Sequence, residues 1–343
     1  MDIVILLSIT LLIYLLPQNK EYLCVKSTSG LRGFLALGII FHHLSPWVTT
    51  GSEFSNFSYM GAYIVSIFFF LSAYGLYNQN ENKKNYLDKF LVTRLSKILL
   101  PFFAVSFIYL LYRFVDGQLL DLNFFISLFK NGSTIIFNGW FVNVIILLYI
   151  FFYTSFNFLQ NKLLSIILNS ILIIFYICLA IKMGYGFWWY NSTLAFILGL
   201  IWAKYQDVID KVLDRYYFVV LFSVAVLLFV SHHYGNLLSY LHIEDSYSYA
   251  LAANINNIIF TIYFVVSFLK KINFSNVFLI LLGGISFELY MIHGLVISML
   301  GKIFVSSPVN DVLLTIFTLI ISISLAWIVN KLVNTITTKV NLL

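Results

Sequence analysis

Long apolar runs separated by short polar connections dominate this sequence and limit what the chain can fold into. Eleven such runs approach or reach the ~17–25 residues that a helix needs to cross a bilayer. They fall at residues 3–16, 33–48, 59–77, 98–115, 140–158, 163–181, 187–203, 217–231, 249–269, 277–300 and 312–333. We therefore expect an all-α fold, a polytopic transmembrane helix bundle of about 10–11 transmembrane helices.

The composition excludes a soluble globular protein. Of the 343 residues, 61% are hydrophobic and only 10% are charged, a balance typical of polytopic membrane proteins. The net charge of +6 is then explained by basic cytoplasmic loops and does not indicate nucleic acid as a partner. We expect one integral-membrane domain over residues 1–343, with no soluble C-terminal domain. The first apolar run lacks a small-residue cleavage site, which favours a short extra helix within residues 1–17 over a signal peptide.

The basic residues are distributed unevenly between the two sides of the predicted bundle. If the N-terminus is outside and the helices alternate, sixteen of the twenty Lys and Arg residues lie in inside loops. The four on the outside are Arg113, Lys130, Lys182 and Lys302. This excess follows the positive-inside rule. It predicts that residues 78–97 and 204–216 are cytoplasmic and that residues 116–139 and 232–248 are outside.

Two of the predicted outside segments have unusual compositions. Residues 122–130, "LNFFISLFK", are apolar and are expected to lie at the membrane interface or to re-enter the bilayer. Residues 231–245 contain side chains capable of binding a metal, but their spacing matches no metal-ligand motif. We expect a solvated loop there and no metal. Those side chains are His232, His233, His242, Glu244 and Asp245.

Residues 30–45, "GLRGFLALGIIFHHLS", place an arginine and two histidines in an apolar run. His43 follows Arg32 by eleven residues, which in a helix is about 16 Å along the axis and about 20° past three full turns. The two side chains therefore share a face, whereas His42 points about 80° away from Arg32. An ionisable side chain that faces the interior of a membrane bundle predicts a functional site. A histidine satisfied by a neighbouring helix, or one at the outer interface, is the alternative that this geometry leaves open.

The spacing of an arginine, ten residues and a histidine resembles the signature of the membrane-bound acyltransferase-3 family, bacterial integral-membrane O-acyltransferases of surface glycans. Four further segments resemble the family's motifs in the family's order. They are "IFFFLSAYGLY" (67–77), "FLVTRLSKILLPFF" (90–103), "GWFVNVIILLY" (139–149) and "GGISFELYMIH" (283–293). Two positions depart from the family pattern. Ala73 stands where glycine is usual, at an expected close helix contact, and Lys97 replaces a frequent arginine, so bidentate phosphate binding is lost there.

The resemblance implies an acyl-CoA-dependent O-acyltransferase in the bacterial plasma membrane, as a multi-pass protein. Its acyl group, usually acetyl, would come from cytoplasmic acetyl-CoA. The acceptor would be a hydroxyl of a cell-surface or capsular polysaccharide, or of its lipid-linked precursor. Acetyl-CoA, a glycan or lipid-linked sugar and membrane lipid are then the expected partners, with no metal cofactor. Residues 231–245 would be placed where they could line a groove for the acceptor glycan.

Fixed cations at the inner face of the membrane are expected to bind the acyl donor, acetyl-CoA. CoA carries several phosphate charges, which arginine and lysine side chains bind through charge-assisted hydrogen bonds. We assign this role to Arg32, Arg94 and Lys97. The nearby Lys83, Lys84 and Lys89 are interpreted as ordinary positive-inside charge.

Transfer to an alcohol needs a base for the hydroxyl proton and donors for the developing oxyanion. His43 is the expected base because the pKa of imidazole lies near neutral pH. A covalent acyl-histidine intermediate is an open alternative. His293, with Tyr290 one turn before it, would orient the acceptor or polarise the thioester carbonyl, or instead form a helix–helix hydrogen bond. Glu288, in the same apolar run, is costly unless it is paired.

Two other classes of membrane protein compete with this interpretation. A transporter or flippase of lipid-linked sugars would predict paired repeats, and the sequence shows no such symmetry. A glycan polymerase, or another membrane transferase that uses a lipid-linked donor, would be expected to carry charged catalytic residues in large outside loops, whereas the outside segments here are sparse in charge. The acyltransferase is therefore favoured. The acceptor sugar, the acyl chain and the oligomeric state are not determined by the sequence.

Overall fold

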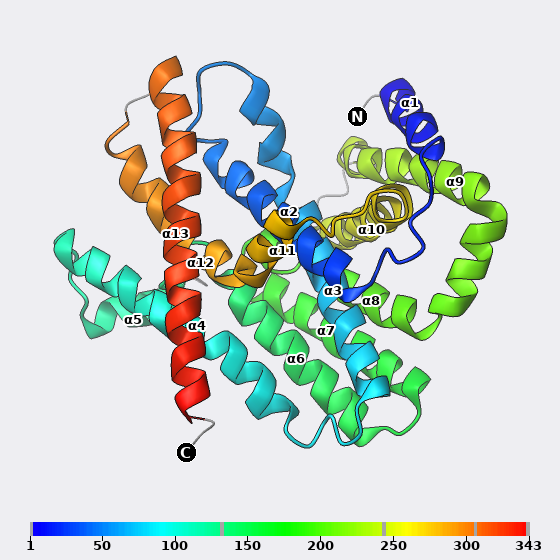
Figure 1. The fold of residues 1–343 in the computed structure, drawn as a ribbon, viewed down its shortest axis with the longest axis horizontal. Coiled ribbons are helices and arrows are strands. Elements are labelled where there is room, and N and C mark those ends of the chain that lie inside the picture. Colours follow the sequence, from blue (N-terminus) through cyan, green and yellow to red (C-terminus); the bar gives the residue numbers. More distant parts are fainter. Residues whose placement is uncertain (1–2, 131–133, 242–244, 305–306, 341–343) are drawn as a thin grey trace. The chain divides into compact units, whose positions relative to one another are not determined.

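The computed structural model of the protein describes residues 3–130, 134–241, 245–304 and 307–340. The described residues form helices and connecting segments and contain no β-strand (Figure 1). The α-helices are α1 (Ile3–Tyr14), α2 (Val25–Leu44), α3 (Gly61–Asn82), α4 (Phe90–Val115), α5 (Leu122–Lys130), α6 (Trp140–Phe158), α7 (Lys162–Lys182), α8 (Ala195–Lys204), α9 (Gln206–Tyr240), α10 (Ser246–Phe264), α11 (Val277–Gly284), α12 (Ser286–Gly301) and α13 (Pro308–Val340). Short 3₁₀ helices occupy η1 (Glu53–Tyr59) and η2 (Phe187–Trp189), and a π-helix, η3 (Val265–Leu269), extends α10.

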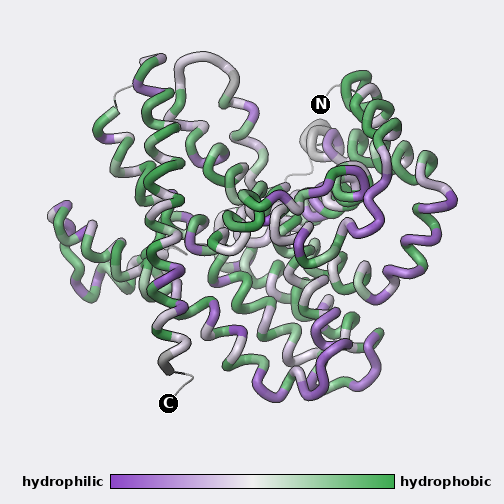
Figure 2. The backbone as a smooth tube through the Cα atoms, viewed as in Figure 1, coloured by the Kyte–Doolittle hydropathy of each residue, from purple (hydrophilic) through white to green (hydrophobic). Residues whose placement is uncertain are grey.

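The prediction of an all-α polytopic bundle is confirmed, although the number of spans differs. Seven of the described helices are long and apolar enough to cross a membrane, or eight if the bent pair α11 and α12 is one span. Each predicted apolar run contains a helix, but α1 and α8 have only 12 and 10 residues. Polar side chains at both ends of α2 lower its hydropathy. Figure 2 shows apolar residues along most of the helices, with hydrophilic residues concentrated in the connections.

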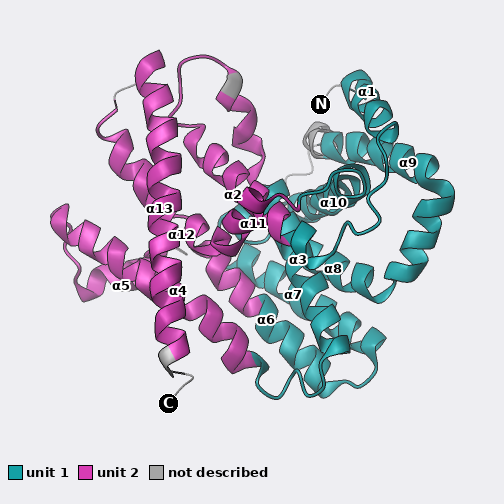
Figure 3. Ribbon diagram, in the orientation of Figure 1, with its two compact units in different colours: residues 1–28, 62–90, 148–274 teal, residues 29–61, 91–147, 275–343 magenta. Residues whose placement is uncertain are grey.

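The described chain forms two compact units, each built from segments far apart in the sequence (Figure 3). Unit 1 comprises residues 1–28, 62–90 and 148–274. Unit 2 comprises residues 29–61, 91–147 and 275–343. Unit 2 therefore contains all six side chains to which the sequence assigns a role in binding or catalysis.

Short polar residues explain where several helices begin and end. The side chains of Asn161, Asp245 and Asn276 accept backbone N–H bonds at the starts of α7, α10 and α11, as N-cap residues do. Gly184 follows α7 with a φ of +71°, a left-handed conformation that ends helices and that glycine adopts at little cost. Pro308 begins α13, a position where its missing N–H is not needed.

Two predicted segments differ from the structure. The run 277–300 is not one helix, because α11 and α12 meet at a bend of 76°. The break follows Gly283 and Gly284, at Ile285 with φ −113° and ψ 9°, where paired small residues favour a kink. Residues 231–240 are not a loop but the last turns of α9, which begins at Gln206 and contains a non-helical residue at Tyr216.

The close helix contact expected at Ala73, where the family usually has glycine, is present in unit 1. Gly199 of α8 lies so near α3 that an added Cβ would meet the Phe70 carbonyl oxygen and the Ala73 Cβ. The glycine that permits this approach is therefore on α8 and not on α3. A small alanine at position 73 is compatible with the contact because the opposite residue has no side chain.

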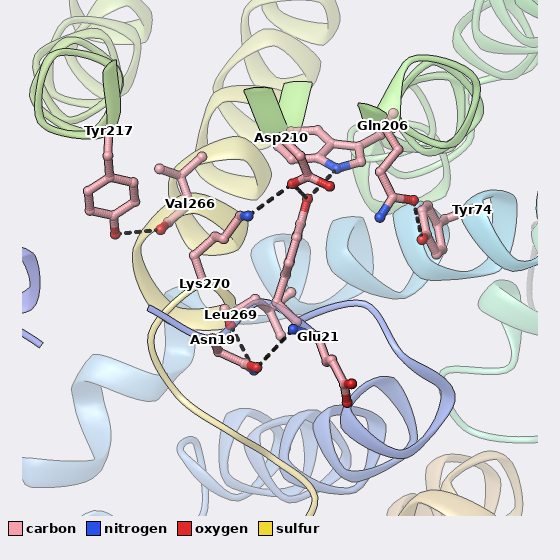
Figure 4. A network of polar contacts seen from close by, with 11 residues as sticks. Asn19, Glu21, Tyr74, Gln206, Asp210, Tyr217, Val266, Leu269 and Lys270 are labelled. Carbon is pink, nitrogen blue, oxygen red and sulfur yellow. Dashed lines mark hydrogen bonds and ion pairs between the residues drawn. The ribbon is translucent and has the colours of Figure 1, made fainter. Parts of the chain in front are cut away.

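A buried polar cluster in unit 1 joins the connection before α2 to helices α8 and α9 and to the end of η3 (Figure 4). We call Tyr22, Trp202, Asp210 and Lys270 the Asp210 cluster. Lys270 is 3% exposed, and its Nζ lies 2.9 Å from Asp210 Oδ1. The Tyr22 hydroxyl donates to Asp210 Oδ1 at 2.9 Å and accepts a bond from Trp202 Nε1 at 3.2 Å. Burial, with the nearby Asp210 carboxylate, raises the pKa of Tyr22, which therefore stays protonated as the donor.

The π-helix η3 lies beside this cluster, and donors from outside the helix bind its carbonyl groups and that of Lys270, the residue after it. Asn19 donates through its backbone N–H to Lys270 O at 2.5 Å and through its side chain to Leu269 O at 3.5 Å. The Tyr217 hydroxyl donates to Val266 O at 2.9 Å (Figure 4). A π-helix displaces the regular hydrogen-bond pattern, and these external donors satisfy the affected carbonyl groups.

Contacts between helix ends agree with the predicted alternation of the helices. In unit 2, Lys302 pairs with Asp116, and Thr50 donates to Asp311, and all four residues are predicted outside. In unit 1, Lys162 pairs with Glu81, and both are predicted inside. Which of the two sides is cytoplasmic stays a prediction from the charge distribution.

Candidate active site

Two histidines from opposite ends of the sequence lie side by side in unit 2. The ring centroids of His43, in the last turns of α2, and His293, in α12, are 5.0 Å apart with an interplanar angle of 30°. His293 is completely buried, and His43 is partly buried. Arg32 and His43 lie on one continuous helix, so the predicted separation of about 16 Å along the axis holds.

Glycines allow α2 to approach the bent pair α11–α12 at both ends. Near the start of α2, a Cβ on Gly33 would meet the Leu279 carbonyl oxygen. A Cβ on Gly283 would likewise meet the Ser29 carbonyl oxygen. At the other end, Gly301 packs on the ring of Trp47. These contacts hold backbone against backbone or ring and place the two imidazoles next to each other.

His293 has one bonded and one unbonded ring nitrogen. Its Nδ1 lies 3.1 Å from the carbonyl oxygen of Leu289 in the preceding turn. Its Nε2 is buried and has no hydrogen-bond partner among the described residues. Buried polar atoms without partners are uncommon in native proteins, so this nitrogen is a candidate for contact with a substrate.

Tyr290, predicted as a site residue, lies beside His293 and binds the connection before α6. Its hydroxyl donates to the backbone carbonyl of Asn138 at 2.5 Å. Its ring centroid lies 5.8 Å from that of His293 and 5.0 Å from that of Phe141. In this structure the hydroxyl holds a backbone segment next to the histidines.

Asn138 is a site residue that the sequence interpretation missed. It has a φ of +62°, a left-handed conformation that asparagine tolerates better than most residues. Its side-chain Nδ2 lies 3.4 Å from Nδ1 of His43, while its carbonyl accepts the Tyr290 hydroxyl. The Asn138–Gly139 pair directly before a helix is a strong turn signal and could have drawn attention to this residue. We call His43, Asn138, Tyr290 and His293 the histidine group.

Residues of α4 support the other face of this connection. The Tyr109 hydroxyl donates to the Met291 carbonyl at 3.1 Å, and the Tyr109 ring packs edge-on against Phe137. Arg113 lies 4.9 Å from the centroid of the Phe137 ring and donates to Ile135 O at 3.4 Å. The segment that carries Asn138 is therefore fixed between α4 and α12.

The His42 ring lies 4.6 Å from the His43 ring, centroid to centroid, and is bound by a different segment. Its Nδ1 lies 3.0 Å from the Phe57 carbonyl in η1. A Cβ at Gly61 would overlap the His42 ring. Because carbonyls only accept hydrogen bonds, His42 donates here and connects α2 to η1.

The cations predicted to bind CoA lie on α2 and α4, and Arg32 is about 16 Å along α2 from His43. Arg32 and Lys97 are exposed and Arg94 is partly buried. Arg94 and Lys97 are three residues apart on α4 and therefore share a face. Their role toward CoA stays a prediction.

Glu288 has a partner on α13. Its Oε1 accepts a bond from Asn330 Nδ2 at 2.8 Å, and the residue is 5% exposed. Glu288 precedes His293 by five residues, about 140° around the helix. It therefore faces α13 and not the histidine group.

The candidate metal ligands of residues 231–245 do not form a site in the part of the chain that the structure describes. His232 binds the Tyr63 hydroxyl at 3.2 Å, and His233 binds the Phe229 carbonyl at 2.8 Å. Asp245 caps α10. His242 and Glu244 lie outside the described residues. No cluster of three His, Cys, Asp or Glu side chains suited to a metal occurs among the described residues.

The apolar helices define a multi-pass membrane protein. The adjacent imidazoles of His43 and His293, one of which has an unbonded nitrogen, form a candidate site for proton transfer. The family model Acyl_transf_3, described as an acyltransferase domain, matches residues 26–331. The chain belongs to this acyltransferase family, which makes it a membrane O-acyltransferase. No curated protein and no solved structure matches it. The matched range contains all six predicted site residues and excludes α1.

Proposed function

We propose that the protein moves an acetyl group from cytoplasmic acetyl-CoA to a hydroxyl of a cell-surface or capsular polysaccharide, or of its lipid-linked precursor. It would do so in a bacterial plasma membrane. The observation that carries this proposal is the His43–His293 pair at 5.0 Å, within a chain of the acyltransferase family. An alcohol attacking a thioester requires one group that accepts its proton and another that stabilises the carbonyl oxygen. Two adjacent imidazoles are able to supply both.

The donor would be bound at the predicted inner end of the same unit. Arg32, Arg94 and Lys97 would bind the phosphates of CoA, and the flexible arm of CoA would extend toward the histidines. Loss of one charge-assisted contact is worth ~1.5–3 kcal/mol, or roughly ten- to a hundred-fold in affinity. Arg32→Ala and Arg94→Ala should each weaken acetyl-CoA binding by that factor. Lys84→Ala, which removes an exposed charge of the same inner segment, serves as the control.

Transfer is tested with the purified protein in liposomes, supplied with labelled acetyl-CoA and surface glycan from the expressing bacterium. The expected product is label in the glycan that mild alkali releases, because an O-acetyl ester is cleaved under those conditions. CoA thiol should be released in step with it. Absence of alkali-labile label from the glycan, in a preparation that binds acetyl-CoA, would exclude the proposed transfer.

The sidedness of the proposal is tested separately with single cysteines. Asn82→Cys should be protected from an impermeant thiol reagent in intact cells, and Leu119→Cys should be labelled, in a background lacking Cys24 and Cys178. Residue 119 is 84% exposed. The reverse labelling pattern would invert the topology and place the cations on the wrong side for cytoplasmic CoA.

A further inference from the structure

The hydrogen bonds of His293 determine which of its ring nitrogens carries the proton. A neutral imidazole has one N–H donor and one lone-pair acceptor. The Leu289 carbonyl, 3.1 Å from Nδ1, is able only to accept. Nδ1 of His293 therefore carries the hydrogen, and Nε2 carries the lone pair. This Nε2 is the buried atom without a partner among the described residues.

His43 is held in the opposite arrangement. The amide nitrogen of Asn138, 3.4 Å from Nδ1 of His43, is able only to donate. Nδ1 of His43 is therefore the acceptor, and the hydrogen of the neutral ring is on Nε2. Hydrogen bonds in unliganded sites are often this long and shorten when substrate binds.

From these two arrangements we propose a division of labour within the histidine pair, which rests on the proposed acyl transfer. His293 is the general base, acting through Nε2. His43 is the electrophilic donor, polarising the thioester carbonyl through its Nε2–H. Asn138 is a positioning residue that fixes the proton of His43 on Nε2. This reverses the expectation from the sequence, which assigned the base to His43.

The reaction balances with these roles. The acceptor hydroxyl attacks the thioester carbon as its proton moves to Nε2 of His293, and the carbonyl oxygen accepts a hydrogen bond from Nε2–H of His43. The tetrahedral intermediate then collapses with cleavage of the C–S bond. The CoA sulfur leaves and takes the proton from His293, so both rings return to their starting forms.

The first test distinguishes two roles for His43, hydrogen-bond donor to the thioester carbonyl and general base. Glutamine places an amide N–H close to where Nε2 of histidine lies, whereas asparagine places it near Nδ1, and neither is basic. His43→Gln should keep transfer within about tenfold of the wild type, while His43→Asn should lose roughly 10²–10³-fold, as for removal of an oxyanion donor. His293→Gln should lose roughly 10²–10⁴-fold because no base is left. The reverse order, with His43→Gln inactive and His293→Gln active, would overturn the assignment.

The second test reads the proton on His43 directly. In protein labelled with ¹⁵N-histidine, the His43 resonances are those that disappear in His43→Gln. The wild type should show Nδ1 in the acceptor form and Nε2 protonated. Asn138→Asp should move the proton to Nδ1, because a carboxylate only accepts. Asn138→Gly keeps the left-handed backbone but removes the side-chain amide. The proton of His43 should then no longer favour Nε2 over Nδ1. A wild-type spectrum with Nδ1 protonated would refute the role of Asn138.

These outcomes are separable from failure of the proposed function. If wild-type protein transfers nothing from acetyl-CoA, the donor or the reaction is wrong, whatever the ring nitrogens show. If the wild type transfers acetyl but His43→Gln is no better than His43→Asn, only the division of labour fails. Thermal unfolding of each variant in detergent restricts the comparison to folded protein.

Discussion

The Asp210 cluster of unit 1 and the histidine group of unit 2 are both buried and polar, but they differ in how completely their hydrogen bonds are satisfied. In the Asp210 cluster, the ammonium, the phenol and the indole N–H each meet an acceptor, and the carboxylate is paired with a lysine. In the histidine group, Nε2 of His293 is buried without a partner among the described residues.

The difference indicates different purposes. A buried polar group that is fully bonded contributes to a unique structure, whereas an unbonded one costs about 1–3 kcal/mol. That cost is offset when a substrate supplies the missing partner. We therefore expect changes in the Asp210 cluster to affect stability and changes in the histidine group to affect the rate.

The largest effect is expected at the histidine group. His293→Ala should lower transfer by roughly 10²–10⁴-fold and His43→Ala by roughly 10²–10³-fold, because a base and an oxyanion donor are removed. His42→Ala is the matched control on the same helix, since its ring binds the Phe57 carbonyl. The measurement is labelled acetyl in the glycan at matched protein levels. An inactive His42→Ala with an active His43→Ala would mean that the adjacent histidine carries the chemistry.

The next effect concerns the stability of unit 1. Lys270→Met removes the buried partner of Asp210, whose own side chain is 29% exposed, and should lower the free energy of unfolding by about 1.5–3 kcal/mol. The double change Lys270→Met with Asp210→Leu should recover much of this loss, because no uncompensated charge is left. Denaturant unfolding in detergent and transfer per folded molecule are measured together. A normal stability combined with a large loss of rate would show that the two groups are not distinct in purpose.

A smaller effect is expected where α2 approaches α11. Gly283→Ala should destabilise the protein by about 1–3 kcal/mol because its Cβ would overlap the Ser29 carbonyl. It should also slow transfer by moving α2, which carries His43. The neighbouring Gly284 has no atom within 4 Å of an added Cβ, so Gly284→Ala is the control. Equal behaviour of the two variants would show that this contact does not position the histidines.

The smallest effect is expected at the exposed Lys302–Asp116 pair, outside both clusters. The hydrogen bond from Lys302 lowers the pKa of Asp116 below its ordinary 3.8, and the same bond raises the pKa of Lys302 above 10.5. A depressed acid pKa gives stability that is present at pH 7 and lost as the pH falls through that pKa. Lys302→Met should therefore lower Tm slightly at pH 7, and the difference from the wild type should shrink as the pH falls below about 3.8 toward the lowered pKa of Asp116. A difference that grows on acidification would contradict this interpretation.

The sequence by itself determined the class of fold and the family, whereas the roles of the site residues that it names stay predictions. Apolar runs of membrane-spanning length predict helices because the chain offers few polar side chains over those stretches, and each run contains a helix. The family match over residues 26–331 confirms the resemblance drawn from five short motifs. The spacing between Arg32 and His43 could be predicted because it depends only on the regular rise and rotation of one continuous helix.

The tertiary structure decided what depends on contacts between helices. The 76° bend between α11 and α12, the glycine contacts with α2 and the meeting of His43 with His293 join segments far apart in the chain, and no local pattern encodes them. Asn138 illustrates the limit most clearly. Its Asn–Gly turn is visible in the sequence, but its bonds to His43 and Tyr290 exist only after three segments fold together. Which nitrogen of each histidine carries the proton is likewise set by the partner it meets, because an isolated imidazole has no fixed choice.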